Sequence, residues 1–351
     1  MYEAFFGLNE RPFDLTVDPR FLFRAAAHRE ALSNLQYGIS GQKGITVLLG
    51  DAGTGKTTLI HLALQMLHER NGHAVYLNNP TLTRAEFYEF LANGFGLTSQ
   101  AALSKTRFLH ELTTLLSERR RNGSANAFVV DEAQSLPDEL LEEVRLLANI
   151  ETNTDKLLSV VLAGQPELGE RLNRPSLRQL KQRIALRCVL LPLNLRETAA
   201  YIAKRISIAG GDSARIFTRE AVEAVYAHSR GVPRTISVIC DNSLVSAFAL
   251  DRRLVDADIV LDVCRDFDFA PPTTRPRTEL AEDAEPAPAF RGGEPRREFG
   301  PPHGEPEAER AARTEQVDAP EDGTLAGTAK PGVGPSDFLT LVRRRRRFSF
   351  F

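Results

Sequence analysis

The sequence predicts an α/β protein in which a parallel sheet is followed by a small helical domain. Up to Leu193, short apolar runs rich in β-branched residues alternate with segments of helical spacing. After Leu193 only helical segments follow, as far as about Ala270. From Pro271 onward the composition changes, since this stretch holds 12 of the 20 prolines. Apolar strands that alternate with helices indicate a parallel sheet covered on both faces.

Five strands and eight helices are expected. The strands are expected at Gly44–Gly50, His73–Asn78, Ala127–Asp131, Leu157–Gln165 and Ala185–Leu193. The helices are expected at Lys56–Arg70, Arg84–Phe95, Lys105–Arg121, Asp138–Ile150, Arg196–Ala209, Thr218–Ser229, Pro233–Ala249 and Asp256–Arg265. We therefore divide the chain into an entry segment with a helix at 1–43, an α/β core at 44–195, a helical lid at 196–270, a linker at 271–336 and a basic-aromatic tail at 337–351.

The overall composition is that of a globular protein. Of the 351 residues, 42% are hydrophobic and 26% are charged, and the net charge of -2 gives no overall attraction to nucleic acid. The three cysteines lack C-x-x-C spacing, which indicates reduced thiols and a cytoplasmic location. We recognise no signal peptide and no run of about 18 apolar residues that would span a bilayer.

The last 81 residues are expected to be disordered in their first part and basic at their end. Residues 279–322 carry 13 acidic and 5 basic side chains and few aliphatic ones, too few to offset the chain entropy of folding. Arg343–Arg347 then lie between apolar residues. Three interpretations of this cluster remain open: a tail without a role, a contact with the inner-membrane surface, or an arm that binds nucleic acid.

The strongest motif is G-D-A-G-T-G-K-T, which fits the P-loop pattern and stands between a predicted strand and a predicted helix. Its glycines let backbone N–H groups surround a phosphate at the start of a helix. Lys56 is expected to reach the β- and γ-phosphates of ATP, and the Thr57 hydroxyl to ligate Mg²⁺. The predicted nucleotide-binding residues of this loop are Gly50, Asp51, Ala52, Gly53, Thr54, Gly55, Lys56, Thr57 and Thr58.

A second motif, A-F-V-V-D-E-A, places two acids at the end of an apolar strand. In phosphoryl-transfer sites of this class an acid at a strand end holds Mg²⁺, which is the role expected of Asp131. Glu132 is then placed to polarise the attacking water, which favours hydrolysis. Taken alone, the two acids could simply cap the next turn, but together with the P-loop they predict one site.

Polar residues after two other strands are weaker candidates. Gln165 follows the fourth predicted strand and is expected to orient the attacking water, the alternative being a turn residue. Asn78 and Asn79 end the second strand, where they either hold Glu132 in an inactive rotamer or form a plain turn.

Arginines outside the core motifs are candidates for contacts with the phosphates. Arg234, in G-V-P-R, begins a helix of the predicted lid and would report the nucleotide state from there. Arg178, Arg183 and Arg187 flank the fifth strand, and we select Arg183 as an arginine finger that acts on a neighbouring subunit's nucleotide. The alternative for both is a solvated helix surface.

The motifs from Met1 to about Phe269 together resemble the AAA+ ATPases of the ExeA/GspA secretion type, including those of exopolysaccharide and PEP-CTERM loci. The resemblance rests on M-Y-x-x-F-F-G-L-x-x-x-P-F, D-P-R-F-L-F, H-R-E-A-L, L-x-Y-G-I, G-D-A-G-T-G-K-T, V-V-D-E-A-Q, L-A-G-Q-P-E-L, R-Q-L-x-Q-R-I and G-V-P-R. It implies an AAA+ fold with a helical lid. It also implies that Gln165 acts as sensor 1, Arg234 as sensor 2 and Arg183 as the finger.

The resemblance further implies ATP and Mg²⁺ as cofactors, a homo-oligomer, and a secretion or export apparatus as partner. ExeA-like members carry a membrane helix and a periplasmic peptidoglycan-binding part after the ATPase region, and we recognise neither in this sequence. Arg343–Arg347 are what such proteins have just before that helix. Two alternatives stay open: a DNA-associated ATPase of the TniB-like transposition type, and a scaffold that nucleotide only locks.

Overall fold

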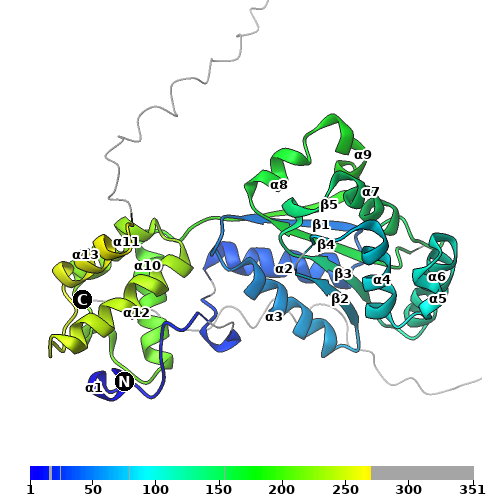
Figure 1. Cartoon of the computed structure of the whole chain (residues 1–351). Helices are drawn as coiled ribbons and strands as arrows, with labels where there is room; N and C mark the ends of the chain where they lie inside the picture. Colours follow the sequence, from blue (N-terminus) through cyan, green and yellow to red (C-terminus); the bar gives the residue numbers. More distant parts are fainter. Residues whose placement is uncertain (16–17, 24, 79, 154, 270–351) are drawn as a thin grey trace, which may run out of the picture. The chain divides into compact units, whose positions relative to one another are not determined.

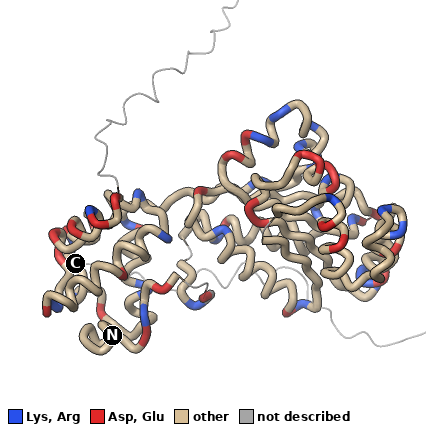
Figure 2. The backbone as a smooth tube through the Cα atoms, in the orientation of Figure 1, with Lys and Arg blue, Asp and Glu red and all other residues tan. Residues whose placement is uncertain are grey.

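The computed structural model describes residues 1–15, 18–23, 25–78, 80–153 and 155–269, and the statements below concern these residues. They belong to one compact unit. The predicted linker at 271–336 and the basic tail at 337–351 lie outside the described residues. In the described part, Lys and Arg are interspersed with Asp and Glu (Figure 2).

A five-stranded parallel sheet forms the centre of the α/β part (Figure 1). Its order is β2-β3-β4-β1-β5, so β1 lies between β4 and β5 and never pairs with β2, the next strand along the chain. Because all strands are parallel, their carboxyl ends lie at one edge of the sheet. The strands are β1 Ile45–Gly50, β2 His73–Leu77, β3 Asn126–Val130, β4 Ser159–Gly164 and β5 Ile184–Leu190.

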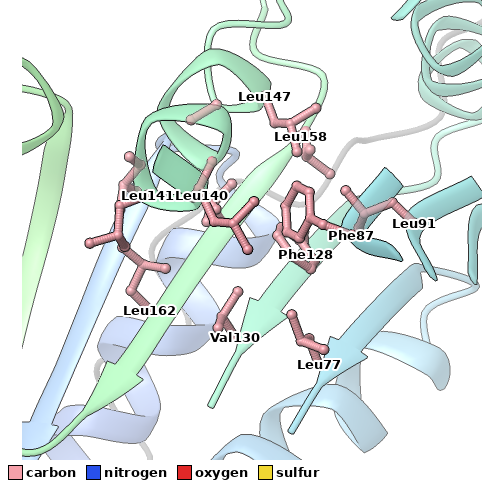
Figure 3. Close-up of a cluster of buried hydrophobic side chains, with 14 of the residues drawn as sticks. Leu77, Phe87, Leu91, Phe128, Val130, Leu140, Leu141, Leu147, Leu158 and Leu162 are labelled. Atoms are coloured by element: carbon pink, nitrogen blue, oxygen red, sulfur yellow. The ribbon is translucent and has the colours of Figure 1, made fainter. Parts of the chain in front are cut away.

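Helices cover both faces of this sheet, as the continuous apolar strands predict. On β3, Phe128 and Val130 face one hydrophobic cluster, whereas Ala127 and Val129 face another. Figure 3 shows the first cluster, in which the strands pack against α4 and α7. The helices on this side are α4 Arg84–Phe95, α5 Ser99–Ala102, α6 Lys105–Arg121 and α7 Asp138–Leu147. The helices on the other side are α2 Ala26–Ser40 and α3 Lys56–His68.

Local capping explains why several helices begin where the sequence predicts. Thr83 and Glu86 form a reciprocal capping box at the start of α4, and the side chain of Ser104 caps α6. Thr218 likewise caps α11 (Arg219–Ser229). The observed bounds of α4, α6 and α12 (Pro233–Ala249) are those expected from the sequence. Two short helices follow β4, namely α8 Pro166–Arg171 and α9 Arg178–Lys181.

Four helices after the sheet form a third hydrophobic cluster, separate from the two on the sheet. They are α10 Leu195–Ile208, α11 Arg219–Ser229, α12 Pro233–Ala249 and α13 Ala257–Asp266. The start of the chain joins this cluster, because Tyr2, Leu8 and Phe13 are buried in it and α1 (Glu3–Phe6) lies between them. The sequence did not indicate that residues 1–13 pack with the helical lid while α2 packs on the sheet.

A buried carboxylate ties three helices of the α/β part together. Glu143 on α7 accepts hydrogen bonds from Lys105 at 2.7 Å and from Tyr88 and Arg84. Burial acts to raise the pKa of Glu143, but the hydrogen bonds and the two cationic charges outweigh it and hold that pKa below its usual value.

We expect Glu143→Gln to lower the free energy of unfolding at neutral pH by about 2 kcal/mol, because charge-assisted hydrogen bonds are lost. The carboxylate contributes its stability above the pKa of an unfolded glutamate, about 4.3. That contribution disappears as the pH falls through the lower pKa of the folded state. Urea unfolding at a series of pH values measures this. Glu142→Gln on the same helix, whose carboxylate is half exposed, is the control. Equal midpoints for both variants at neutral pH would contradict the assignment.

Candidate functional site

The loop between β1 and α3 has the backbone of a phosphate-binding turn. Gly53 and Gly55 have φ angles of 81° and 98°, a region that glycine enters without steric cost. The loop ends at the first turn of α3, where backbone N–H groups that have no partner within a helix are available to bind an anion. His28 from α2 anchors the loop through a 3.0 Å hydrogen bond between its Nε2 and the carbonyl of Thr54. Burial lowers the pKa of His28, which favours the neutral ring as the donor of this bond.

Lys56 is buried at the start of α3, and its ammonium points into the loop. Its Nζ donates to the carbonyl of Gly50 at 2.8 Å and to that of Asp51 at 3.1 Å. Burial lowers the pKa of Lys56, and the nearby carboxylates of Glu132 and Asp131 oppose that shift. The loop therefore holds a cation among backbone carbonyls, next to two acids.

The acids come from the end of β3, two strands away from the loop in the sheet. Thr57 Oγ1 donates to Asp131 Oδ2 at 2.7 Å, and Tyr76 on β2 donates to the same oxygen at 3.1 Å. Burial, together with the charge of Asp131, raises the pKa of the Tyr76 phenol, so this group remains a donor. The hydroxyl and carboxylate oxygens of Thr57 and Asp131 are the kind of ligand that Mg²⁺ takes beside nucleotide phosphates. The two residues thus fit the predicted metal site.

Glu132 follows Asp131 with a left-handed backbone, φ 51° and ψ 39°. Its Oε2 accepts hydrogen bonds from Gln165 Nε2 at 3.2 Å and from Gln134 Nε2. Burial acts to raise the pKa of Glu132, but these two amides and the charge of Lys56 lower it below the usual value. At neutral pH the group is therefore an ionised carboxylate, as a general base requires.

The lid reaches the loop at the start of α12. The backbone N–H of Arg234 donates to the carbonyl of Gly53 at 3.2 Å, and a Cβ at Gly53 would lie 2.7 Å from Arg234 Cβ. Gly231 has φ 75°, and a Cβ there would come within 1.8 Å of the Leu193 carbonyl. A side chain at position 231 is therefore excluded.

A cavity of about 360 Å³ lies between the loop and the lid. Ala52 and Thr58 line it from the loop side, Glu132 from the strand end, and Tyr201 and Arg234 from the lid. The volume falls within the range of pockets for small molecules.

Arg183 is the one predicted catalytic residue that lies outside this cluster. It is exposed and directly precedes β5, at the amino end of a strand parallel to β1. The P-loop follows the carboxyl end of β1, so Arg183 lies at the opposite edge of the sheet from its own loop. A contact between Arg183 and a nucleotide would therefore involve a second copy of the chain.

Sequence reasoning missed three polar residues of the site: His28, Tyr76 and Gln134. Tyr76 lies inside a strand whose apolar pattern indicates packing, and His28 begins H-R-E-A-L, a motif of the family resemblance to which no role was assigned. Gln134 belongs to V-V-D-E-A-Q, and its place two residues after Glu132 was the only available signal. Asn78 and Asn79 were candidate partners of Glu132, but the side-chain amides that donate to Glu132 among the described contacts are those of Gln134 and Gln165. Asn79 lies outside the described residues.

We expect Tyr76→Phe to raise the Mg²⁺ concentration for half-maximal activity of the predicted ATPase about five- to tenfold, because Asp131 loses a hydrogen bond that orients it. Turnover at saturating Mg²⁺ should change little. A Mg²⁺ titration at fixed ATP measures the effect. Tyr88→Phe is the matched control, since it removes a phenol that donates to a carboxylate outside the site. An unchanged Mg²⁺ requirement in Tyr76→Phe would show that Asp131 is positioned without this hydroxyl.

Comparisons with known proteins agree with this architecture. Residues 39–172 match the family described as AAA domain. Over 262 residues the chain is 40% identical to general secretion pathway protein A of Aeromonas hydrophila. This aligned region covers 74% of this chain and 48% of that protein. The chain thus spans about half the length of this relative.

Two solved structures share the fold at low sequence identity. The ORC2 protein of Aeropyrum pernix has a TM-score of 0.54 at 16% identity, over 74% of this chain and 71% of that one. Cdc6p of Pyrobaculum aerophilum has a TM-score of 0.55 at 16% identity, over 73% and 70%. The α/β sheet with a helical lid is therefore the AAA+ arrangement that the sequence predicted. Across the described ranges, we find no helix with the length and hydropathy to traverse a bilayer.

Proposed function

We propose that this chain, which has the AAA+ fold and is similar to general secretion pathway protein A, hydrolyses ATP with Mg²⁺ to assemble or remodel a bacterial secretion or polysaccharide-export apparatus. One observation carries the catalytic part of the proposal. The side chains of Thr57 in the P-loop and of Asp131, which directly follows β3, are 74 positions apart in the sequence and meet at 2.7 Å at the carboxyl edge of the sheet. Such a pairing unites the two motifs that phosphoryl transfer needs.

Each residue of the cluster has a separate task in the proposed reaction. Lys56 and the loop amides bind the β- and γ-phosphates, and Arg234 contacts them from the lid. Glu132 accepts the proton of the attacking water while Gln165 orients it. Mg²⁺, held by Thr57 and Asp131, would neutralise charge on the phosphates. In such sites most of the rate enhancement comes from positioning and electrostatics.

The exposed position of Arg183 supports a shared site between copies of the chain. We propose that the chain forms a homo-oligomer in which Arg183 of one copy approaches the nucleotide of the next. ATPase activity per subunit should then rise with protein concentration. We also propose that the chain works in the cytoplasm, where ATP is available, and that its partners are components of the export apparatus. A contact of Arg343–Arg347 with the inner-membrane surface is part of the same proposal.

The deciding experiment measures phosphate release by the purified full chain with ATP, in the presence of Mg²⁺ and then of EDTA. We expect turnover only with Mg²⁺ and at protein concentrations that support oligomers. Bound ATP without turnover under all these conditions would favour the nucleotide-locked scaffold. Stimulation by duplex DNA with a steep salt dependence would favour the transposition alternative. In the described residues, Lys and Arg are interspersed with Asp and Glu, whereas a DNA-binding surface is typically a basic patch (Figure 2).

A further inference from the structure

The side chain of Gln134 connects two groups that the proposed reaction uses. Its Nε2 donates to Glu132 Oε2, and its Oε1 accepts from the backbone N–H of Gln165 at 3.2 Å. Both ends of one carboxamide are thus engaged. One end holds the side chain of the general base, and the other holds the backbone at the end of β4.

The surroundings of this carboxamide are shaped to receive it. A Cβ at Gly164, the last residue of β4, would lie 2.7 Å from Gln134 Oε1, so the absence of a side chain there makes room for the amide. Arg171 on α8 donates to the carbonyl of Gln134 and also pairs with Asp138 at the start of α7. The backbone of Gln134 is therefore held by a side chain that is itself anchored.

The hydrogen bonds on Glu132 explain why its orientation matters. Gln134 and Gln165 both donate to Oε2, and the Glu132 side chain lines the cavity, so Oε1 is the oxygen that these two amides leave for the attacking water. A glutamate side chain has three rotatable bonds, and a base that samples several rotamers abstracts a proton less often. A partner that fixes Oε2 therefore increases the fraction of time in which Oε1 points to the water.

We propose that Gln134 is a positioning residue that fixes the rotamer of Glu132 by tying it to the end of β4. The inference rests on the proposed function, because it assigns Gln134 a part in the same hydrolysis. It predicts that substitution of Gln134 changes turnover but leaves nucleotide binding unchanged. Gln134 is not among the described residues that line the cavity beside the P-loop.

The first test compares Gln134→Ala with the wild-type chain in steady-state ATP hydrolysis and in equilibrium ATP binding. We expect kcat to fall at least tenfold, with KM and the ATP dissociation constant within twofold of wild type. Gly164→Ala should give the same pattern, because its methyl group displaces the amide. Gln100→Ala is the matched control, since it removes an exposed amide on α5 that bonds only Arg107 among the described contacts. Unchanged kcat in Gln134→Ala would overturn the inference.

The second test is a double-mutant cycle with Glu132→Gln, followed by single-turnover measurements. If Gln134 acts through Glu132, adding Gln134→Ala to Glu132→Gln causes no further loss of the residual rate. An equal loss in both backgrounds would mean that Gln134 acts independently, and the inference would be wrong. A wild-type chain that binds ATP but shows no turnover would instead remove the proposed function itself, and the two failures are thereby distinguished.

Discussion

Glu132→Gln should leave ATP bound to the chain while turnover falls by about 10²–10⁴, the range that a positioned general base contributes. The substitution keeps the size of the side chain and its place between Gln134 and Gln165, but the amide cannot accept a proton. The pKa of Glu132 lies below its usual value, so the wild-type group is ionised and ready to act at neutral pH.

Phosphate release and the dissociation constant of ATP, measured on the same preparation, check this expectation. Glu142→Gln serves as the control, because it makes the same chemical change on an exposed part of α7. If Glu132→Gln hydrolyses ATP at the parental rate, Glu132 is not the base.

Lys56→Ala should abolish detectable nucleotide binding, with the dissociation constant of ATP rising at least about 100-fold. Two charge-assisted hydrogen bonds to phosphate, each contributing about 1.5–3 kcal/mol, correspond to a loss of this size or larger. The carbonyls of Gly50 and Asp51 now fix the ammonium in the loop, so the cation needs little reorganisation to meet a phosphate. Equilibrium binding of a fluorescent ATP analogue measures the change.

Lys43→Ala is the matched control for this variant. Lys43 is exposed near the amino end of β1, where its ammonium lies over the Tyr37 ring. Its removal should not alter nucleotide binding. Tight ATP binding by Lys56→Ala would mean that the loop amides alone hold the triphosphate, and the assignment of Lys56 would be wrong.

Much of the fold follows from local signals in the sequence. The bounds of α4 and α6 could be predicted because Thr83 and Ser104 are capping residues directly before helical periodicity. The strand ends were less well placed. The fourth strand was expected at Leu157–Gln165 but spans Ser159–Gly164, since Gln165 instead precedes the proline that begins α8.

The contacts that depend on the order of the strands could not be predicted. Tyr76 reaches Asp131 because β2 pairs with β3, a neighbour that the sequence alone does not name. The burial of Tyr2 and Phe13 against the lid likewise joins residues about 200 positions apart. The motifs located Lys56, Thr57, Asp131 and Glu132, whereas the groups that hold them in place emerged only from the tertiary structure.

The left-handed backbone at Glu132 has a consequence for protein engineering. An L-residue in this conformation is sterically disfavoured, and glycine or asparagine would adopt it at lower cost. Selection of variants for thermal stability alone would therefore tend to replace glutamate at this position, and the selected proteins would lack the carboxylate of the proposed general base. Under the proposed role of Glu132 as general base, glutamate at this position is a compromise in which stability is lost in favour of catalysis.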